Sequence, residues 1–554
     1  MPHPQQPRPF PRIGVLTALI AALLLTLTAC SSLIPGSAVV AAGDGAVGTA
    51  SPRTSTTPAP IPAGLERFYE RELDWGSCAE LATSEDRRYF RSASLQCATL
   101  TVPLVYDDAA DPTAPTISIG VLRKVATDQD NRIGSVVLNP GGPGGSGVEY
   151  AGQLAGFGIG ADLNKSFDIV GFDPRGVGAS SPLVTCQTDA ERDAARAQTP
   201  RTRTQQEIDA ANAAKEKVAQ QCFSRTGAEQ GIDGATFLGT IGTRDVAKDM
   251  DVLRAAIGDD QLTYFGGSYG TLLGTVYAEL FPKNVRAMIL DGAVDANADP
   301  IEQDLGQSEG FQQAFEDFAA WCGEQDTCAL GTSPDTATSN YQALVRPLLD
   351  QPLPLADGRV LAFGDATIGT ISALYSDDSW ESLSAALTDL SNGKGEPLMA
   401  LADGYQERDA DGRYSNFLEV LPAVHCMDDP RITDEAVLQA AAEKYAAAAP
   451  FFDTGDPPAA LKNLCDFWPV EPTLTPHQVE VTGLPQVLVI STTGDPATPY
   501  QAGVDLAQAL DARLLTVEGT RHGAYLGAGL SCVDNIGTRY LITLQLPKAG
   551  TTCS

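Results

Sequence analysis

The chain has 554 residues, with 37 Lys and Arg against 70 Asp and Glu, so its formal net charge is −33. This balance argues against nucleic-acid binding, because a phosphate backbone requires a basic surface. Hydrophobic residues make up 43% and charged residues 19% of the chain, which is typical of a globular protein and not of a disordered one.

The first 29 residues have the pattern of an export signal. Arg8 and Arg12 precede an uncharged, largely apolar run over residues 13–29. The run ends in Leu27-Thr28-Ala29-Cys30, which resembles the lipobox of bacterial lipoproteins. We therefore expect residues 1–29 to be a lipoprotein signal peptide and Cys30 to carry the lipid. The protein would then be exported and held at the cell membrane, facing the envelope or exterior. An ordinary secretory signal followed by a chance cysteine is the alternative.

Residues 30–63 are mostly Ala, Gly, Ser, Thr and Pro. Such a segment buries too little apolar surface to offset its ordering entropy, so we expect a flexible tether.

The cysteines that follow support export. Ten remain after Cys30: Cys78, Cys97, Cys186, Cys222, Cys322, Cys328, Cys426, Cys465, Cys532 and Cys553. An even number in an exported chain predicts up to five disulfides, and the short separation of Cys322 and Cys328 favours a local bridge. No CxxC pair is present and the chain has four His, so no metal site is expected.

Short apolar runs rich in β-branched or aromatic residues predict the strands of a mainly parallel sheet covered on both faces. They are residues 135–139, 167–172, 262–265, 286–290, 486–490 and 513–517. Between residues 295 and 482 these signals fade and helical patterns dominate. The fold class expected is α/β, a mainly parallel sheet with core segments 64–295 and 483–554 and a large, mostly helical cap inserted over 296–482.

The motif Gly266-Gly267-Ser268-Tyr269-Gly270 follows one predicted strand and precedes a helix-prone segment. In that context G-x-S-x-G is a nucleophile elbow, whose glycines allow the sharp turn that exposes the Ser268 hydroxyl. A glycine-rich turn without catalytic function is the alternative.

A glycine-rich loop over residues 139–147 follows another predicted strand. Its backbone N–H groups can approach an oxyanion and supply the partner for the N–H of Tyr269. A phosphate-binding loop is disfavoured, because no Gly-Lys-Ser/Thr follows and the next charged residue, Glu149, is acidic.

Two further residues complete a catalytic set. Asp495 follows the predicted strand 486–490, and His522 follows the predicted strand 513–517. The order Ser268, Asp495, His522 is that of α/β-hydrolases. A serine hydroxyl needs a base, so His522 would take its proton while Asp495 orients the imidazole.

Together with residues 172–180, Phe-Asp-Pro-Arg-Gly-Val-Gly-Ala-Ser, these motifs resemble the actinobacterial tripeptidyl aminopeptidases, relatives of proline iminopeptidase. The resemblance runs from about Trp75 to the C-terminus. It implies an exported serine peptidase that removes short peptides from free N-termini and needs no cofactor. Because the glycine-rich loop 139–147 matches the corresponding loop of that family, the resemblance implies that the Gly142 N–H is the second oxyanion donor, beside the N–H of Tyr269. Asn139-Pro140 stands where proline iminopeptidases carry His, which favours the tripeptidyl branch.

An exopeptidase must also recognise the substrate amine, most simply with a carboxylate. Residues 301–480 hold 31 Asp and Glu against 8 Lys and Arg, and Glu149 beside the glycine loop is a further candidate. A soluble acidic surface without a binding role is the plain alternative. For the whole protein, a carboxylesterase, lipase or endopeptidase with the same triad, or a peptide-binding lipoprotein without activity, remain alternatives.

Overall fold

The computed structural model describes residues 60–82 and 87–554. The predicted signal peptide, Cys30 and the tether up to residue 59 lie outside the described residues. All the described residues belong to one compact unit. Within them, no helix has the length and apolarity required to cross a membrane.

The centre of the fold is one sheet with the strand order β1-β2-β3-β5-β4-β6-β7-β10-β11-β12. Neighbouring strands in the part β5-β4-β6-β7-β10-β11-β12 are all parallel, whereas β1, β2 and β3 pair antiparallel, and β3 also pairs antiparallel with β5. The strands are β1 Gly76–Ser77, β2 Leu95–Pro103, β3 Thr116–Lys124, β4 Gly134–Asn139, β5 Phe167–Phe172, β6 Leu262–Gly267, β7 Val285–Asp291, β10 Leu488–Thr492, β11 Arg513–Val517 and β12 Thr552–Cys553. The predicted mainly parallel sheet is therefore confirmed, with β10 two residues later than expected.

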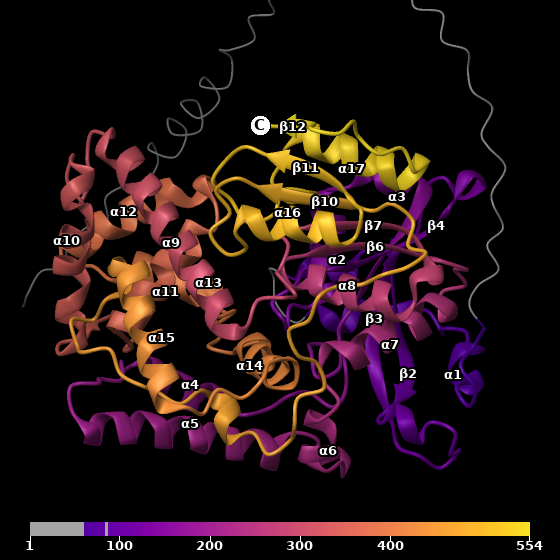
Figure 1. The fold of residues 1–554 in the computed structure, drawn as a ribbon, viewed down its shortest axis with the longest axis horizontal. Coiled ribbons are helices and arrows are strands. Elements are labelled where there is room, and N and C mark those ends of the chain that lie inside the picture. Colours follow the sequence, from indigo (N-terminus) through magenta and orange to yellow (C-terminus); the bar gives the residue numbers. More distant parts are fainter. Residues whose placement is uncertain (1–59, 83–86) are drawn as a thin grey trace, which may run out of the picture. The chain divides into compact units, whose positions relative to one another are not determined.

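Helices cover both faces of this sheet (Figure 1). One face packs against α7 Thr243–Ala256, α8 Tyr269–Leu280 and α16 Tyr500–Ala509. The other packs against α2 Gly147–Phe157, α3 Ala161–Ser166 and α17 Ser531–Thr543. Because both faces are covered, every residue of β4 and β5 is buried, which explains their continuous apolar sequence.

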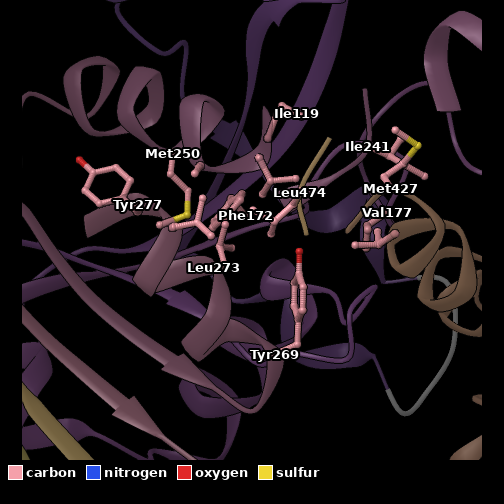
Figure 2. Close-up of a cluster of buried hydrophobic side chains, with 14 of the residues drawn as sticks. Ile119, Phe172, Val177, Ile241, Met250, Tyr269, Leu273, Tyr277, Met427 and Leu474 are labelled. Atoms are coloured by element: carbon pink, nitrogen blue, oxygen red, sulfur yellow. The ribbon is translucent and has the colours of Figure 1, made fainter. Parts of the chain in front are cut away.

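The core on the α7 and α8 face reaches the predicted nucleophile elbow. Figure 2 shows the Tyr269 side chain extending into this cluster, together with Leu273 of α8 and Phe172 of β5. Met427, which follows β7 by more than a hundred residues, packs in the same cluster. The start of helix α8 is thus fixed from both the sheet and the later part of the chain.

The segment between β7 and β10 is mostly helical and has its own hydrophobic cluster. We call it the cap; Figure 1 shows much of it beside the sheet. Its helices are α9 Pro300–Gly323, α10 Pro334–Val345, α11 Phe363–Leu374, α12 Trp380–Ser391, α13 Glu396–Tyr405, α14 Phe417–Asp428 and α15 Glu435–Ala448, and a hairpin pairs β8 Leu353–Pro354 with β9 Val360–Leu361. A second insertion between β5 and β6 contains α4 Asp189–Arg196, α5 Gln205–Arg225 and α6 Gly234–Leu238; the short α1 Glu66–Tyr69 precedes the sheet.

The ten cysteines downstream of the tether form five disulfides, as the even count predicts. The bridges are Cys78–Cys97, Cys186–Cys222, Cys322–Cys328, Cys426–Cys465 and Cys532–Cys553. They close loops of 6 to 39 residues, so each restricts the unfolded chain, and bridges of this kind typically contribute about 2–5 kcal/mol. Cys426–Cys465 joins α14 of the cap to a later turn that packs on α5.

Candidate active site

The predicted catalytic residues lie at the carboxyl ends of parallel strands. Ser268 follows β6, Asp495 follows β10, and His522 follows β11. Strands β6, β7, β10 and β11 are consecutive neighbours in the sheet, so their carboxyl ends open on one edge. The three residues therefore come together although 254 positions separate the first from the last.

Ser268 has the backbone geometry of a nucleophile elbow. Its φ is 54° and its ψ is −128°, a strained conformation for a residue with a side chain. Close packing demands the flanking glycines: a Cβ on Gly266 would lie 2.3 Å from the Gly270 carbonyl oxygen. A Cβ on Gly270 would lie 2.7 Å from the Asn139 carbonyl oxygen. The sequence Gly-Gly-Ser-Tyr-Gly is thus the one that allows the turn.

His522 and Asp495 form a closely matched pair. The imidazole Nδ1 lies 2.9 Å and 3.0 Å from the two carboxylate oxygens of Asp495. The Asp495 side chain is completely buried and that of His522 is 12% exposed. Since Nδ1–H donates to the carboxylate, Nε2 is the nitrogen left to exchange a proton with Ser268.

Backbone and hydroxyl donors hold Asp495 in place. One carboxylate oxygen accepts the N–H groups of Ala497 and Thr498, each at 2.9 Å. The other accepts the Thr498 hydroxyl at 3.0 Å, and that hydroxyl also lies 3.2 Å from Nδ1 of His522. Thr498 therefore contacts both partners, a role that its sequence position does not reveal.

The glycine-rich loop contacts the elbow directly. A Cβ on Gly141 would lie 2.8 Å from Ser268 Cβ and 3.0 Å from the Tyr269 nitrogen, so only glycine fits there. Among the described residues, neither the Gly142 N–H nor the Tyr269 N–H donates a hydrogen bond. Two backbone donors beside the Ser268 side chain are what an oxyanion site requires.

Asp291, at the end of β7, ties the elbow to the histidine loop. Its carbonyl oxygen accepts the Ser268 N–H at 2.9 Å. One carboxylate oxygen accepts the N–H groups of Ala524 and Tyr525, each at 2.7 Å. Burial raises the pKa of Asp291 to about 6. Asp291 is not among the residues predicted from the sequence, although an Asp at the end of a buried strand is a usable signal.

The catalytic residues open into a cavity of about 1900 Å³ bordered by the glycine loop and the cap. Ser268, His522 and the glycine loop form part of its wall, and Tyr405 and Phe417 from the cap form another part. Glu149 also borders the cavity, where Arg87 pairs with its carboxylate and the Tyr89 hydroxyl donates to it. Glu149 is thus a fixed carboxylate that faces the same space as Ser268.

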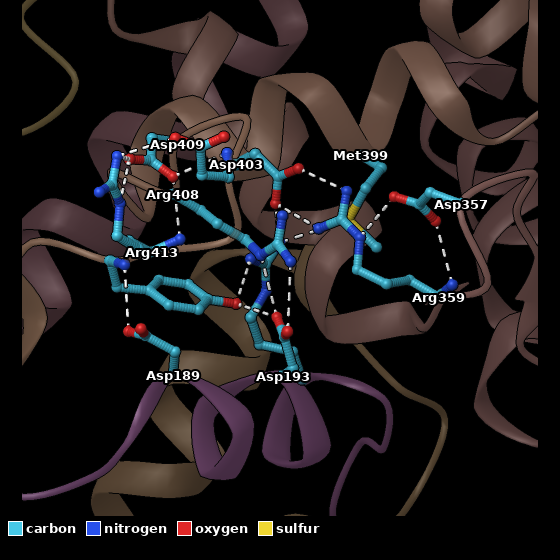
Figure 3. A network of polar contacts seen from close by, with 12 residues as sticks. Asp189, Asp193, Asp357, Arg359, Met399, Asp403, Arg408, Asp409 and Arg413 are labelled. Carbon is cyan, nitrogen blue, oxygen red and sulfur yellow. Dashed lines mark hydrogen bonds and ion pairs between the residues drawn. The ribbon is translucent and has the colours of Figure 1, made fainter. Parts of the chain in front are cut away.

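Residues 406–416 join α13 to α14 and bring cap side chains into the cavity. Figure 3 shows the polar network that holds this loop: Arg408 and the Tyr414 hydroxyl bind Asp193 of α4, at 3.0 and 2.6 Å. Arg359 continues the network through Asp403 at 2.7 Å. The loop is therefore anchored to both insertions, which fixes the cap side chains at the cavity wall.

The protonation of the His522 imidazole should determine how kcat/KM depends on pH. Burial lowers the pKa of His522, but the charge and hydrogen bond of Asp495 outweigh it, so the pKa lies above its usual value of 6.5. A general base must be neutral, so activity is lost as pH falls through this raised value. We expect the acidic limb of kcat/KM above about pH 6.5.

The pH profile of Asp495→Asn provides the check, because removing the carboxylate charge should move the acidic limb of the residual activity to lower pH. His477→Gln is the control, since His477 pairs with Glu279 outside the cavity and should leave the limb in place. A limb that shifts equally in both variants, or in neither, would contradict the assignment of His522.

The sheet, the elbow and the Asp495–His522 pair define a serine hydrolase with the α/β-hydrolase fold. A family model described as the alpha/beta hydrolase fold matches residues 134–528, so the chain belongs to that family.

Sequence comparison identifies similar proteins within this family. The chain is 43% identical over 472 residues to "Serine protease Hip1" of Mycobacterium tuberculosis, covering 82% of this chain and 87% of the relative. It is 42% identical over 525 residues to "Carboxylesterase B" of the same species, covering 94% and 96%. It is 30% identical over 491 residues to "Tripeptidyl aminopeptidase" of Streptomyces lividans, covering 87% and 86%. The resemblance to tripeptidyl aminopeptidases is therefore confirmed at the level of the family.

Proposed function

We propose that this protein is a serine peptidase that releases short peptides from the free N-termini of peptides or proteins. The similarity to tripeptidyl aminopeptidases suggests that the released peptides have three residues. The observation that carries the proposal is a pair of carboxylates in the cavity beside Ser268. Glu149 comes from the core and Glu407 from the anchored cap loop, and both border the cavity. Burial raises the pKa of Glu407, and the negative charge of Glu149 adds to the effect.

Two carboxylates that border one cavity repel each other, and a protonated amine bound by both would relieve that repulsion. Glu149 is held by Arg87 and Tyr89, and Glu407 by the Ser415 hydroxyl, so neither side chain has to be ordered by the substrate. Glu407 also has a φ of 51°, so its backbone is held in a conformation rare for a residue with a side chain. This is the preorganisation expected of a site that recognises a chain end.

The reaction follows from the proposed roles. Ser268 Oγ attacks the substrate carbonyl while its proton moves to Nε2 of His522, and the N–H groups of Gly142 and Tyr269 stabilise the oxyanion. Nε2 then gives the proton to the leaving nitrogen, the C–N bond breaks, and the N-terminal segment remains as an ester on Ser268. Water, deprotonated by His522, hydrolyses this ester.

The experiment compares anilides of one to four residues with free and acetylated N-termini. Acetylation removes the positive charge and the N–H donors that the two carboxylates would bind, so kcat/KM should fall about 30-fold to several thousand-fold, equivalent to about 2–5 kcal/mol. The loss should persist at high salt, because screening weakens only long-range attraction.

Glu407→Gln should lower kcat/KM for the free substrate and leave the acetylated one nearly unchanged. Asp411→Asn is the matched control, since Asp411 is on the same loop but pairs with Arg413 and does not border the cavity. Equal kcat/KM for free and acetylated substrates would overturn the aminopeptidase proposal.

A carboxylesterase is the second candidate, favoured by the 42% identical relative with that name. An ester with the same tripeptidyl acyl group, free and acetylated, distinguishes the two. A carboxylesterase would cleave both esters equally and the anilides poorly, because recognition would not involve the amine.

We also propose that the protein is exported and lipid-anchored at Cys30, on the strength of the lipobox. Cys30→Ala should release the protein from membranes without changing kcat/KM, because a lipid adds membrane affinity and no group to the active site. Fractionation and mass spectrometry of the mature N-terminus provide the measurement. Unmodified Cys30 in membrane-bound mature protein would contradict the anchor.

A further inference from the structure

A second, smaller cavity of about 300 Å³ also reaches Ser268 and His522. Its wall includes the side chains of Tyr150 and Phe265, and the loop that follows His522 supplies Gly527 and Ala528. Gly527 is exposed, as is the Asp378 side chain, so the cavity opens to solvent between them. Ser268 and His522 can therefore be reached from two cavities.

A short stretch of cap backbone separates the two cavities. Residues 375–377 run antiparallel to residues 520–522: the His522 N–H donates to the Tyr375 carbonyl at 2.8 Å, and the Asp377 N–H to the Thr520 carbonyl at 3.1 Å. Ser376 is extended, with φ −155° and ψ 138°. Successive side chains of an extended chain point to opposite sides. Accordingly, Tyr375 borders the large cavity and Ser376 the small one.

The chemistry of the two cavities differs. The large cavity contains Glu149 and Glu407, the carboxylates proposed to bind the substrate amine. The small cavity has apolar residues in its wall, and its cation, Arg521, pairs with Asp377 at 2.6 Å and Asp378 at 3.3 Å. Asp291 also borders this cavity, and one of its carboxylate oxygens accepts the N–H groups of Ala524 and Tyr525. Because Arg521 is already paired, a chain-end carboxylate gains little there, whereas an uncharged, apolar segment fits the apolar part of the wall.

We infer that the small cavity is the binding site for the part of the peptide chain downstream of the scissile bond, with preference for an apolar residue next to that bond. This inference rests on the proposed function. When the C–N bond breaks, the new amine takes its proton from Nε2 of His522 and leaves through the small cavity, while the acyl part stays on Ser268 in the large one. Because the small cavity opens to solvent, the leaving chain has room to extend beyond the cavity.

Two glycines allow a matched test. Gly527 borders the small cavity and Gly404 the large one. At both positions an added Cβ has no atom within 4 Å, and neither residue has a positive φ, so a side chain is accepted without strain. Gly527→Leu should fill the small cavity, and Gly404→Leu should obstruct the large one.

The substrates share one free tripeptidyl acyl group and differ in the leaving group, which is methanol in the ester and a Leu-initiated tetrapeptide in the peptide. Gly527→Leu should lower kcat/KM for the peptide about 10-fold or more and change that for the ester less than about 2-fold, because an overfilled pocket discriminates by size. Retained ester cleavage also shows that the variant folds. Gly404→Leu should lower both values in parallel.

The fraction of the acyl enzyme that reacts with an added amine instead of water gives a second measurement. The acyl group on Ser268 can pass to an added amine, and the amine must then bind where the leaving amine departs. Leucinamide should divert part of the ester reaction to tripeptidyl-leucinamide in the wild-type protein, and Gly527→Leu should reduce that fraction about 10-fold.

Three results would overturn the inference: equal effects of Gly527→Leu on ester and peptide, no effect on either, or discrimination between leaving groups by Gly404→Leu instead. A failure of the proposed aminopeptidase function gives a different result. If the free amine is not recognised, acetylated and free esters react equally, while Gly527→Leu still discriminates between leaving groups.

Discussion

Ser268→Ala is expected to reduce turnover by roughly 10⁶-fold, because the nucleophile, base and acid act as a unit. The structure gives Ser268 the strained elbow conformation and packs the glycine-rich loop against it at Gly141. Steady-state kinetics with a free tripeptidyl anilide provides the measurement. Ser372→Ala is the matched control, since Ser372 borders the same cavity on a cap helix and should leave activity near that of the wild type.

Covalent labelling locates the nucleophile independently of turnover. A serine-directed phosphonate or sulfonyl fluoride should modify Ser268, whereas thiol reagents and chelators should have little effect, since the cysteines that follow the tether are paired in disulfides. Labelling of another serine, or full inhibition by a chelator, is incompatible with this assignment.

His522→Ala should cost about as much as loss of the nucleophile, roughly 10⁶-fold, and Asp495→Asn roughly 10⁴-fold. The smaller effect follows from the role of Asp495, which orients the imidazole and stabilises its charged form without exchanging a proton with the substrate. The hydrogen bonds from Thr498 and Ala497 should preserve the position of the asparagine carbonyl oxygen.

The kcat values of both variants and their double variant provide the check. The double variant should be no slower than His522→Ala alone, because Asp495 acts through His522. Near-wild-type activity in either single variant, or additive losses in the double variant, would show that another base operates.

Much of the sheet could be predicted from the sequence because the parallel strands are buried on both faces. β4 and β5 are fully buried, have largely apolar sequences and lie where expected. β2 and β3 escape prediction because exposed or half-buried polar residues interrupt their sequences, and they pair antiparallel at the edge of the parallel sheet.

Ser268 and His522 could be singled out from the sequence because the first is part of a local motif and the second is a rare residue type, whereas Asp495 was chosen by its place after a predicted strand. Ser268 lies in a five-residue motif, and His522 was one of three histidines beyond the signal peptide. In the structure the other two contact different carboxylates: His425, which also borders the large cavity, lies 2.8 Å from Asp429, and His477 lies 3.1 Å from Glu279 outside it.

The proposed amine site could not be singled out in the same way. Glu407 is one of 31 acidic residues in region 301–480, and the anchored loop brings it to the wall of the cavity that Glu149 also borders. Thr498 likewise gains its role from a contact with a residue distant in sequence, His522, which no local pattern encodes.

In the proposed mechanism Ser268 carries the N-terminal segment of the substrate as an ester during turnover. Rapid acid quenching during cleavage of a free tripeptidyl methyl ester, followed by peptide mapping with mass spectrometry, detects this ester. A tripeptidyl adduct on Ser268 is expected, absent from Ser268→Ala and much reduced with the acetylated ester. An adduct on another residue, or equal adducts from free and acetylated esters, would contradict it.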